Sequence, residues 1–508
     1  MLLTLILAPL AGAALLAAWR GAGDRAAGRL AAWWSLIPIV LVALLGFRGA
    51  NAQGLMADWS LDWIPDAGIT LSFAVDGTSW LFLLLTALVT AFVLAVSIQK
   101  GLTSRSYAAL ILVMETMLLG VFTARHFIPF FLGWEMTLIP AYLLIRLWGG
   151  PNAPRAARRF FIVTLGGGVC MLLGFLALQI GVNTMDFGQL TEMASKGELA
   201  AGLATTFAGT GLTGPTLLLT VAVAVLLGLA VKIPIVPFHA WLPDAYAEAP
   251  TPVTMLLTGL LSKMGVYGLL RVFLPVFPEV YATLAPWLAA LAVATVLLGA
   301  VAALAQKDLK RILAYSSVNH LGYCVLAAAA VVASQGDRES ASSAISGAFL
   351  QAFNHGIIAS AMFFGIAILE SRSGGLRGLD DFGGLRARVP VLCGLMGLAI
   401  FASLGLPGLS GFIGEFLVFN GTFGLLPWAA AVSVLGLLFT AIFLLRLIRK
   451  VFHGPLGQLG SNWADLSASE RWLFAPVIAL IVIPGLWPQV LLQFLNADTL
   501  RLLDFLKP

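Results

Sequence analysis

Residues 221–241 have the sequence VAVAVLLGLAVKIPIVPFHAW. An apolar run carries a lysine, Lys232, and two prolines follow at once, Pro234 and Pro237. Proline lacks a backbone N–H and displaces the carbonyl four residues back, so a helix cannot continue through this stretch. Backbone groups freed at membrane depth are tolerated only where protein or water satisfies them. The stretch therefore predicts a broken membrane helix beside a buried charge.

A second stretch of the same kind is GLPGLSG at residues 405–411, and Glu415 follows it. Broken helices in corresponding places of two halves are typical of transporters built from inverted repeats. Counted along the predicted spans, the breaks fall in the seventh and the twelfth. We expect two inverted five-helix repeats, at residues 108–274 (helices 4–8) and 282–450 (helices 9–13). Residues 1–107 would supply three flanking helices, and 451–508 a loop and a last helix.

Composition places the whole chain in a membrane. Of 508 residues, 60% are apolar and 10% are charged, and the mean hydropathy is +0.97. Soluble domains have about 45–50% apolar and about 25% charged residues, which argues against a soluble enzyme, a nucleic-acid-binding protein and a disordered scaffold. A membrane helix needs about 20 apolar residues. Fourteen segments approach this length: 2–19, 31–47, 76–97, 108–125, 127–147, 158–181, 215–238, 252–274, 282–305, 311–333, 342–369, 390–419, 427–448 and 472–495. The fold class expected is an all-α polytopic membrane protein.

The basic residues support this topology. With alternating loops, 20 of the 29 Lys and Arg residues fall on one side and 7 on the other, leaving two lysines inside spans. Basic residues are retained on the cytoplasmic side, so both termini are predicted to face away from the cytoplasm. Since no basic segment precedes it, the apolar N-terminus is interpreted as a first membrane helix rather than a signal peptide.

The chain has no recognisable means of carrying electrons. Cys170, Cys324 and Cys393 stand singly in apolar runs, whereas zinc and iron–sulfur sites need clustered thiolates. The sequence also contains no Gly-rich dinucleotide motif and no P-loop. We expect no cofactor and no metal in this chain, so any redox chemistry would lie in a partner.

Five charged residues lie inside predicted spans: Lys232, Lys263, Glu115, Glu135 and Glu415. A charge at mid-membrane costs at least about 2.5–3.5 kcal/mol, so these groups must pair, exchange protons or line water. A static structural ion pair would explain any one of them. The set of five favours a transport path for something charged, most simply protons.

Two histidines, His320 and His355, fall in the tenth and eleventh spans. Histidine titrates near neutral pH, so two in a polar file can pass protons. A single membrane histidine is more often a hydrogen-bonded packing residue. Because these two lie between Lys263 and Glu415 in span order, we favour the relay. A Glu135–Lys232 pair is a further hypothesis: separating the two would let either exchange a proton.

Four segments carry a resemblance: GWEMTLIPAYLLIRLWGG (133–150), AVKIPIVPFHAWLPDAYAEAPTPVTMLLTGLLSKMGVYGLLR (230–271), QKDLKRILAYSSVNHLGY (306–323) and GLPGLSGFIGEFLVF (405–419). They resemble the antiporter-like membrane subunits of proton-pumping NADH:quinone oxidoreductase (complex I, NDH-1). This family also includes Mrp-type cation/proton antiporters and membrane-bound hydrogenase subunits. The resemblance covers roughly residues 70–455.

The resemblance implies roles for the buried residues. Glu135 and Lys232 would form a coupling ion pair, and Lys263 would be the central relay lysine. His320 and His355 would extend the polar axis towards Glu415, an exit-side or neighbour-linking carboxylate. Glu115 matches a glutamate often present in one paralogue, the M type (NuoM in respiratory and NdhD in photosynthetic complexes). Glu415 also favours the M type, since the L and N types usually carry lysine there. His126 departs from the aspartate of many relatives.

The resemblance also implies an assembly. The partners would be other complex I membrane-arm subunits, including two paralogous antiporter-like chains, and the lipid bilayer, with no nucleic acid. NAD(P)H or ferredoxin, iron–sulfur clusters and a quinone (ubiquinone, menaquinone or plastoquinone) would belong to partner subunits. The location would be a bacterial plasma membrane or a cyanobacterial thylakoid membrane. The alternatives are an Mrp-type monovalent cation/proton antiporter subunit, a membrane-bound hydrogenase subunit and a purely structural membrane anchor.

Overall fold

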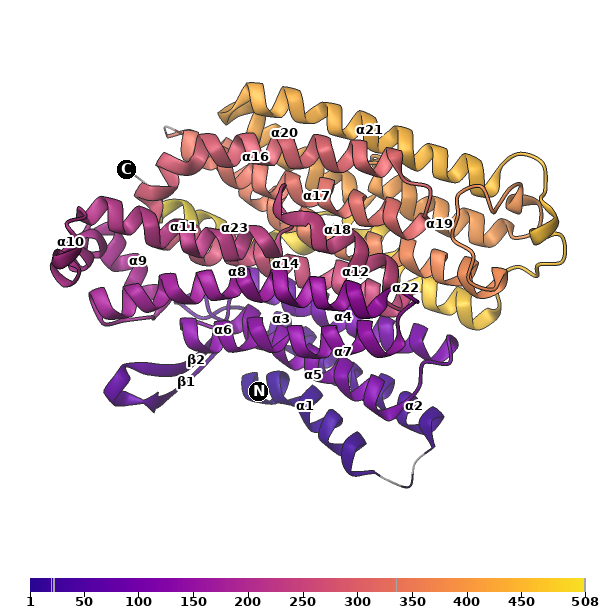
Figure 1. Cartoon of the computed structure of the whole chain (residues 1–508), viewed down its shortest axis with the longest axis horizontal. Coiled ribbons are helices and arrows are strands. Elements are labelled where there is room, and N and C mark those ends of the chain that lie inside the picture. The colour runs from indigo at the N-terminus through magenta and orange to yellow at the C-terminus, as the bar shows by residue number, and fades with distance from the viewer. Residues whose placement is uncertain (20, 22, 335, 507–508) are drawn as a thin grey trace.

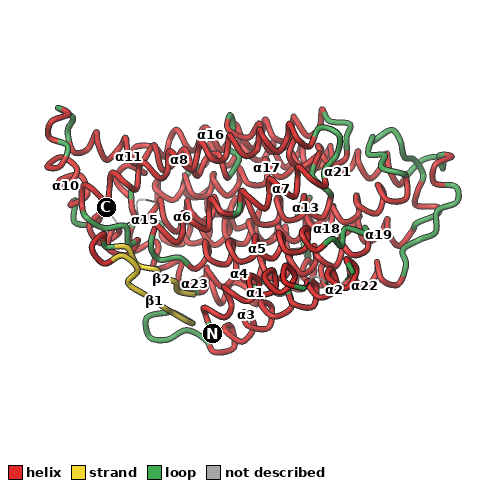
Figure 2. Tube along the Cα trace, turned by 60° about the horizontal axis from the view of Figure 1, so that its bottom comes forward, coloured by secondary structure: helices red, strands yellow, loops and turns green. Residues whose placement is uncertain are grey.

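A computed structural model describes residues 1–19, 21, 23–334 and 336–506. Long helices lie side by side through most of the chain, and one β-hairpin projects at one end of the bundle (Figure 1). Both termini lie towards the end that carries this hairpin and helices α9 and α10. The long loops between α18 and α19 and between α21 and α22 lie at the opposite end (Figure 2).

The elements of the first half are α1 (Leu2–Ala18), α2 (Asp24–Trp34), α3 (Leu36–Arg48), β1 (Ala57–Ile64), β2 (Ile69–Val75), α4 (Gly77–Gln99), α5 (Arg105–Thr123), α6 (Phe127–Met136), α7 (Leu138–Trp148), α8 (Ala153–Val182), α9 (Phe187–Ser195), α10 (Glu198–Thr206), α11 (Gly214–Lys232), η3 (Phe238–Trp241), α12 (Leu242–Glu248), α13 (Thr251–Leu256), η4 (Leu257–Leu261), α14 (Ser262–Gly268), η5 (Leu269–Phe273) and α15 (Leu274–Val276). The second half contains α16 (Pro278–Ala305), α17 (Leu309–Val331), α18 (Arg338–Ser373), α19 (Pro390–Ser403), α20 (Ser410–Leu425), α21 (Pro427–Phe452), α22 (Ala468–Leu486) and α23 (Gln489–Phe505).

The all-α polytopic fold class is confirmed. Within the described residues, twelve helices are long and apolar enough to cross a membrane, and two shorter apolar helices are α1 and α19. Each of the fourteen predicted spans overlaps one of these helices. Arg20 and Lys507, which enter the count of basic residues, lie outside the described part of the chain.

Both predicted helix breaks are present. Helix α11 ends at Lys232, and the chain resumes helical geometry only at η3. In the second half α19 ends at Ser403 and α20 begins at Ser410. Lys232 and Glu415 therefore each lie close to an interruption of a helix. The grouping of the helices into two inverted repeats, and the residue boundaries of those repeats, remain predictions.

Residues 48–75 lie outside the predicted membrane spans, yet β1 and β2 form an antiparallel hairpin there. The stretch ADWSLDWI of β1 alternates polar and apolar residues with the period of a strand. The predicted last span, 472–495, is wrong at its end. Helix α22 stops at Leu486, because Trp487 leaves the helical conformation (φ −136°, ψ 76°), as residues that precede a proline tend to, and α23 forms a separate helix.

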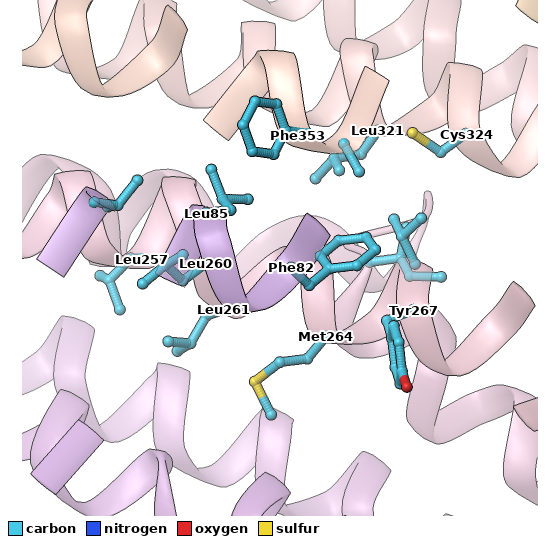
Figure 3. Packing of buried hydrophobic residues seen from close by; sticks show 14 of the residues in the cluster. Phe82, Leu85, Leu257, Leu260, Leu261, Met264, Tyr267, Leu321, Cys324 and Phe353 are labelled. Atoms are coloured by element: carbon cyan, nitrogen blue, oxygen red, sulfur yellow. The ribbon is translucent and has the colours of Figure 1, made fainter. Parts of the chain in front are cut away.

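The helix that carries Lys263 packs within a largely apolar core at the centre of the bundle. Side chains of Leu257, Leu260, Leu261 and Met264 belong to one buried cluster with Phe82 of α4. Figure 3 shows Phe82 on the side of Leu321, Cys324 and Phe353 from the neighbouring helices, whereas Leu261 and Met264 point to the opposite side. Any polar group at this depth must find its partners within the protein.

Candidate functional site

Lys263 lies at the middle of the segment Thr251–Val276, whose most apolar stretch is wholly buried. Its side chain is fully buried, and its ammonium donates to the Thr258 carbonyl at 2.5 Å. Thr258 lies in η4, a π-helical turn in which a carbonyl faces the residue five positions on. The local widening of the helix thus turns a backbone acceptor towards the lysine. A second π-helical turn, η5, follows after the two turns of α14.

A line of polar contacts leads from Lys263 into the second half of the chain. The Lys263 Nζ lies 2.7 Å from Nδ1 of His355 on α18. The ring of His355 lies 5.3 Å, centroid to centroid, from that of His320 on α17. Nδ1 of His320 is 3.3 Å from Oε1 of Glu415 on α20. All four side chains are buried, so the structure brings four of the seven predicted site residues together.

Residues beside the second helix break contact His320 and supply Glu415. Ser403, the last residue of α19, lies 3.1 Å from Nε2 of His320, and Glu415 follows on α20. Gly405 between them has φ +70°, a conformation that L side chains rarely adopt. A Cβ at Gly405 would overlap the Oε2 atom of Glu415. Glycine at residue 405 therefore leaves free the space that the Glu415 carboxylate occupies.

Glu135 and Lys232 are both inside the first half of the bundle, but the structure does not join them. Neither Oε atom of Glu135 nor Nζ of Lys232 has a hydrogen-bond partner among the described residues. The Lys232 ammonium lies 5.1 Å from the ring centroid of Trp134, the residue before Glu135 in sequence. A cation over an indole ring is stabilised by the ring's electrons. On α8, Gly168 leaves the space that the Glu135 carboxylate occupies, because a Cβ there would overlap it.

Glu115 on α5 stands apart from these contacts. Its side chain is fully buried, and neither carboxylate oxygen has a hydrogen-bond partner among the described residues. The structure gives Glu115 no contact with the line from Lys263 to Glu415.

Three contact residues of the line were not predicted from the sequence: Thr258, Gln351 and Ser403. The Gln351 Nε2 lies 3.3 Å from Nδ1 of His320, on the side where Glu415 also approaches. Gln351 precedes His355 by four residues and therefore shares its helix face. That spacing was a usable signal for Gln351. Thr258 contributes a backbone carbonyl and Ser403 depends on the fold of the break, so no pattern in the sequence marks either one.

The geometry can support stepwise proton transfer. Each imidazole can accept a proton on one nitrogen and release one from the other. The lysine at one end and the carboxylate at the other can each change charge. Among the described residues, no three His, Cys, Asp or Glu side chains are grouped so that they could hold a metal ion. Fold and site together define a multi-pass membrane protein with a buried line of titratable side chains.

Comparison with known proteins identifies the family. Residues 124–440 match the model of the NADH:quinone oxidoreductase/Mrp antiporter transmembrane family. Subunit M of the F(420)H(2) dehydrogenase of Methanosarcina mazei is 35% identical over 466 residues, which cover 90% of this chain and 88% of the relative. An NAD(P)H-quinone oxidoreductase chain 4 of Thermosynechococcus vestitus is 33% identical over 490 residues, 93% and 87% of the two chains. The chain belongs to the NADH:quinone oxidoreductase/Mrp antiporter family of membrane subunits.

Solved structures agree with this assignment. A chain of respiratory complex I from Thermus thermophilus superposes with a TM-score of 0.85 at 28% identity, with both chains covered completely. A chain of the Mrp complex from a Dietzia species superposes with a TM-score of 0.82 at 19% identity, covering 99% of each. The second similarity concerns the fold alone. The resemblance found in the sequence is therefore confirmed, including its M-type relatives.

Proposed function

We propose that this chain is the M-type proton-translocating membrane subunit of a quinone oxidoreductase complex. The observation that carries the proposal is the buried line Lys263–His355–His320–Glu415, with 2.7 Å between lysine and histidine and 3.3 Å between histidine and glutamate. Two curated relatives, named as a subunit M and a chain 4, belong to dehydrogenases or quinone oxidoreductases by name. The match with a respiratory complex I chain gives the same assembly.

The chemistry allows protons to move along the line in either direction between Lys263 and Glu415. A proton on Lys263 passes to Nδ1 of His355, which releases one from its other nitrogen towards His320. His320 then passes a proton to Glu415, which becomes neutral. Each transfer moves one positive charge by one group, and the reverse order reloads Lys263. Glu135 and Lys232 act as the coupling pair in this proposal: when they approach each other the charges stabilise each other, and when they part either one exchanges a proton.

The electron transfer belongs to partner subunits. They would bind the donor, which the names of the relatives give as F420H2 or NAD(P)H, and for which ferredoxin is the sequence-based alternative. They would also hold the iron–sulfur clusters and the quinone site. Two paralogous antiporter-like chains would pack beside this subunit in the membrane arm. Reduction of quinone would perturb the buried charges, and this chain would convert the perturbation into proton movement.

Isolation of the native complex tests the proposal. The tagged chain is extracted gently from its own membranes, the companions are identified by mass spectrometry, and the complex is reconstituted into vesicles. We expect iron–sulfur and quinone-site subunits, and proton transport on addition of donor and quinone that does not need Na⁺ or K⁺. Small Mrp-type companions without a redox subunit, with transport that requires a monovalent cation, would instead identify a cation/proton antiporter.

A further inference from the structure

A cavity of about 450 Å³ lies at the end of the bundle that carries α9 and the β-hairpin. Its lining includes Ser79, Tyr267, Arg271, Asp76 and Asp498, whereas Gln53 and Arg501 at its edge are exposed. Since a water molecule takes about 30 Å³ of liquid, the space is large enough for several waters. The bias of basic residues predicts that this end faces away from the cytoplasm.

The cavity begins one helical turn from the relay lysine. Lys263, Tyr267 and Arg271 follow each other at intervals of four residues, so they share a face of one helix. Tyr267 is buried, and its hydroxyl lies 3.2 Å from Oγ of Ser79 and donates to the Phe122 carbonyl at 3.0 Å. Arg271 forms an ion pair with Asp76, the residue that caps α4. The polar face thus runs from the lysine towards solvent.

Aromatic rings pack around Tyr267. The ring of Phe82 lies 5.5 Å from that of Tyr267, 5.0 Å from that of Phe122 and 6.2 Å from that of Phe349. Figure 3 shows Phe82 and Tyr267 within the apolar packing that surrounds Met264. Lys263 directs its own hydrogen bonds to Thr258 and His355 instead. In this arrangement no hydrogen bond among the described residues joins Lys263 to Tyr267.

Asp498 is a second buried carboxylate in the cavity wall, in addition to Asp76, which forms the ion pair with Arg271. It accepts from the backbone N–H of Thr78 at 2.8 Å and from the Thr78 hydroxyl at 3.3 Å. Its side chain is 4% exposed, and Oδ1 lies 3.5 Å from Nη1 of the exposed Arg501. Burial and the nearby Asp76 carboxylate raise the pKa of Asp498 to about 6, against the opposing effect of Arg271 and Arg501. Such a carboxyl takes up and releases protons near neutral pH.

We propose that this cavity is the outward release site for protons held at Lys263, with Tyr267 as the connecting group and Asp498 as the acceptor at the outer end. The proposal rests on the proton-translocating function proposed above. When the Lys263 ammonium turns from His355 towards Tyr267, the Tyr267 oxygen accepts its proton, and the Tyr267 hydroxyl proton leaves the Phe122 carbonyl and passes to Ser79. The Ser79 hydroxyl in turn gives its proton to a water in the cavity. Asp498 accepts it, becomes neutral and then releases it to the outer solution.

Three variants of the intact complex in vesicles test the proposal through protons pumped per quinone reduced. Tyr267→Phe keeps the ring but removes the hydroxyl, and Asp498→Asn removes the titrating oxygen at nearly constant size. Asp504→Asn makes the same change on the same helix at an exposed ion pair with Arg338. We expect the first two to lower the pumping ratio to that of Lys263→Ala, and Asp504→Asn to keep the unaltered ratio.

A labelling experiment tests the cavity without measuring turnover. It therefore gives a result even where one of the pumping variants fails to assemble. Ser79→Cys, at a position that lines the cavity, is treated in the complex from the outer side with a membrane-impermeant thiol reagent. Thr86→Cys, two turns deeper and not part of the cavity lining, is the control. We expect label at position 79 above the background of the native cysteines, and none at position 86. An unlabelled position 79 would overturn the proposal.

The outcomes separate this proposal from the function on which it rests. A normal ratio in Tyr267→Phe and Asp498→Asn together with a lowered ratio in Lys263→Ala would refute the release site alone. A normal ratio in Lys263→Ala would refute the proposed function itself.

Discussion

Gly405→Ala isolates the contact between Glu415 and His320. A Cβ at position 405 would overlap Oε2 of Glu415, so the carboxylate must move by about 1 Å to reach ordinary van der Waals separation. The Oε1–Nδ1 distance of 3.3 Å is already at the long end of the hydrogen-bonding range, and a further shift of this size takes it outside. A misplacement of about 1 Å at a reacting group can cost about a hundredfold in rate.

The same turn supplies a matched control. Gly408 also has positive φ, at +91°, but the nearest atom to a Cβ there is Leu486 Cδ2 at an ordinary 3.7 Å. Alanine in this backbone region costs about 1–2 kcal/mol at either position, so the two variants share the same strain and differ only at Glu415. The assay is proton pumping per quinone reduced in vesicles, with assembly checked on native gels. We expect pumping to fall strongly in Gly405→Ala and little in Gly408→Ala, and equal pumping in the two would refute the reasoning.

Three further predictions use other contacts. Gly168→Ala would displace the Glu135 carboxylate, whereas a Cβ at Gly166 meets nothing within 4 Å; pumping assays should therefore show a loss in the first variant and none in Gly166→Ala. Ser403→Ala removes the 3.1 Å contact to Nε2 of His320, and we expect slower pumping with unchanged quinone reduction in the uncoupled complex; unchanged pumping would show that Ser403 does not orient the ring. The pKa of Asp498 is raised from 3.8 to about 6, so its contribution to stability is complete below pH 3.8 and is lost as the pH rises through 6. Asp498→Asn should then raise the unfolding temperature relative to the unaltered protein at pH 8 but not at pH 4, as measured by tryptophan fluorescence, and an equal difference at both pH values would contradict this assignment.

Much of the fold could be predicted because the membrane imposes strict local rules. Apolar length fixes the helices, and Pro234 and Pro407 fix where two of them break, as α11 and the α19–α20 turn bear out. The β-hairpin was not predicted, because its two strands are short and lie outside the apolar runs. The sequence predicts one span where the structure has α22 and α23, because the apolar pattern continues on both sides of Trp487 and Pro488, where the helix ends.

The candidate site was predictable in its members but not in its connections. Charge and histidine at membrane depth identified Lys263, His355, His320 and Glu415, and the fold places them in one line. The distance between Glu135 and Lys232 depends on how α6 and α11 pack, which spacing along the chain does not encode. Arg271 contributed only to the count of basic residues, and Asp498 had no pattern of its own. Arg271 and Asp498 line one cavity together with Asp76, and this brings together segments more than 400 residues apart in the sequence.

The ratio of protons pumped to quinone reduced in Lys263→Ala tests the central claim most directly. Lys196→Ala is the control, because Lys196 is an exposed lysine paired with Glu192 outside the membrane spans. The account predicts that the intact complex with Lys263→Ala pumps fewer protons per quinone, while Lys196→Ala matches the unaltered complex. An assembled Lys263→Ala complex with an unchanged ratio would contradict the account and leave the chain as a structural membrane subunit.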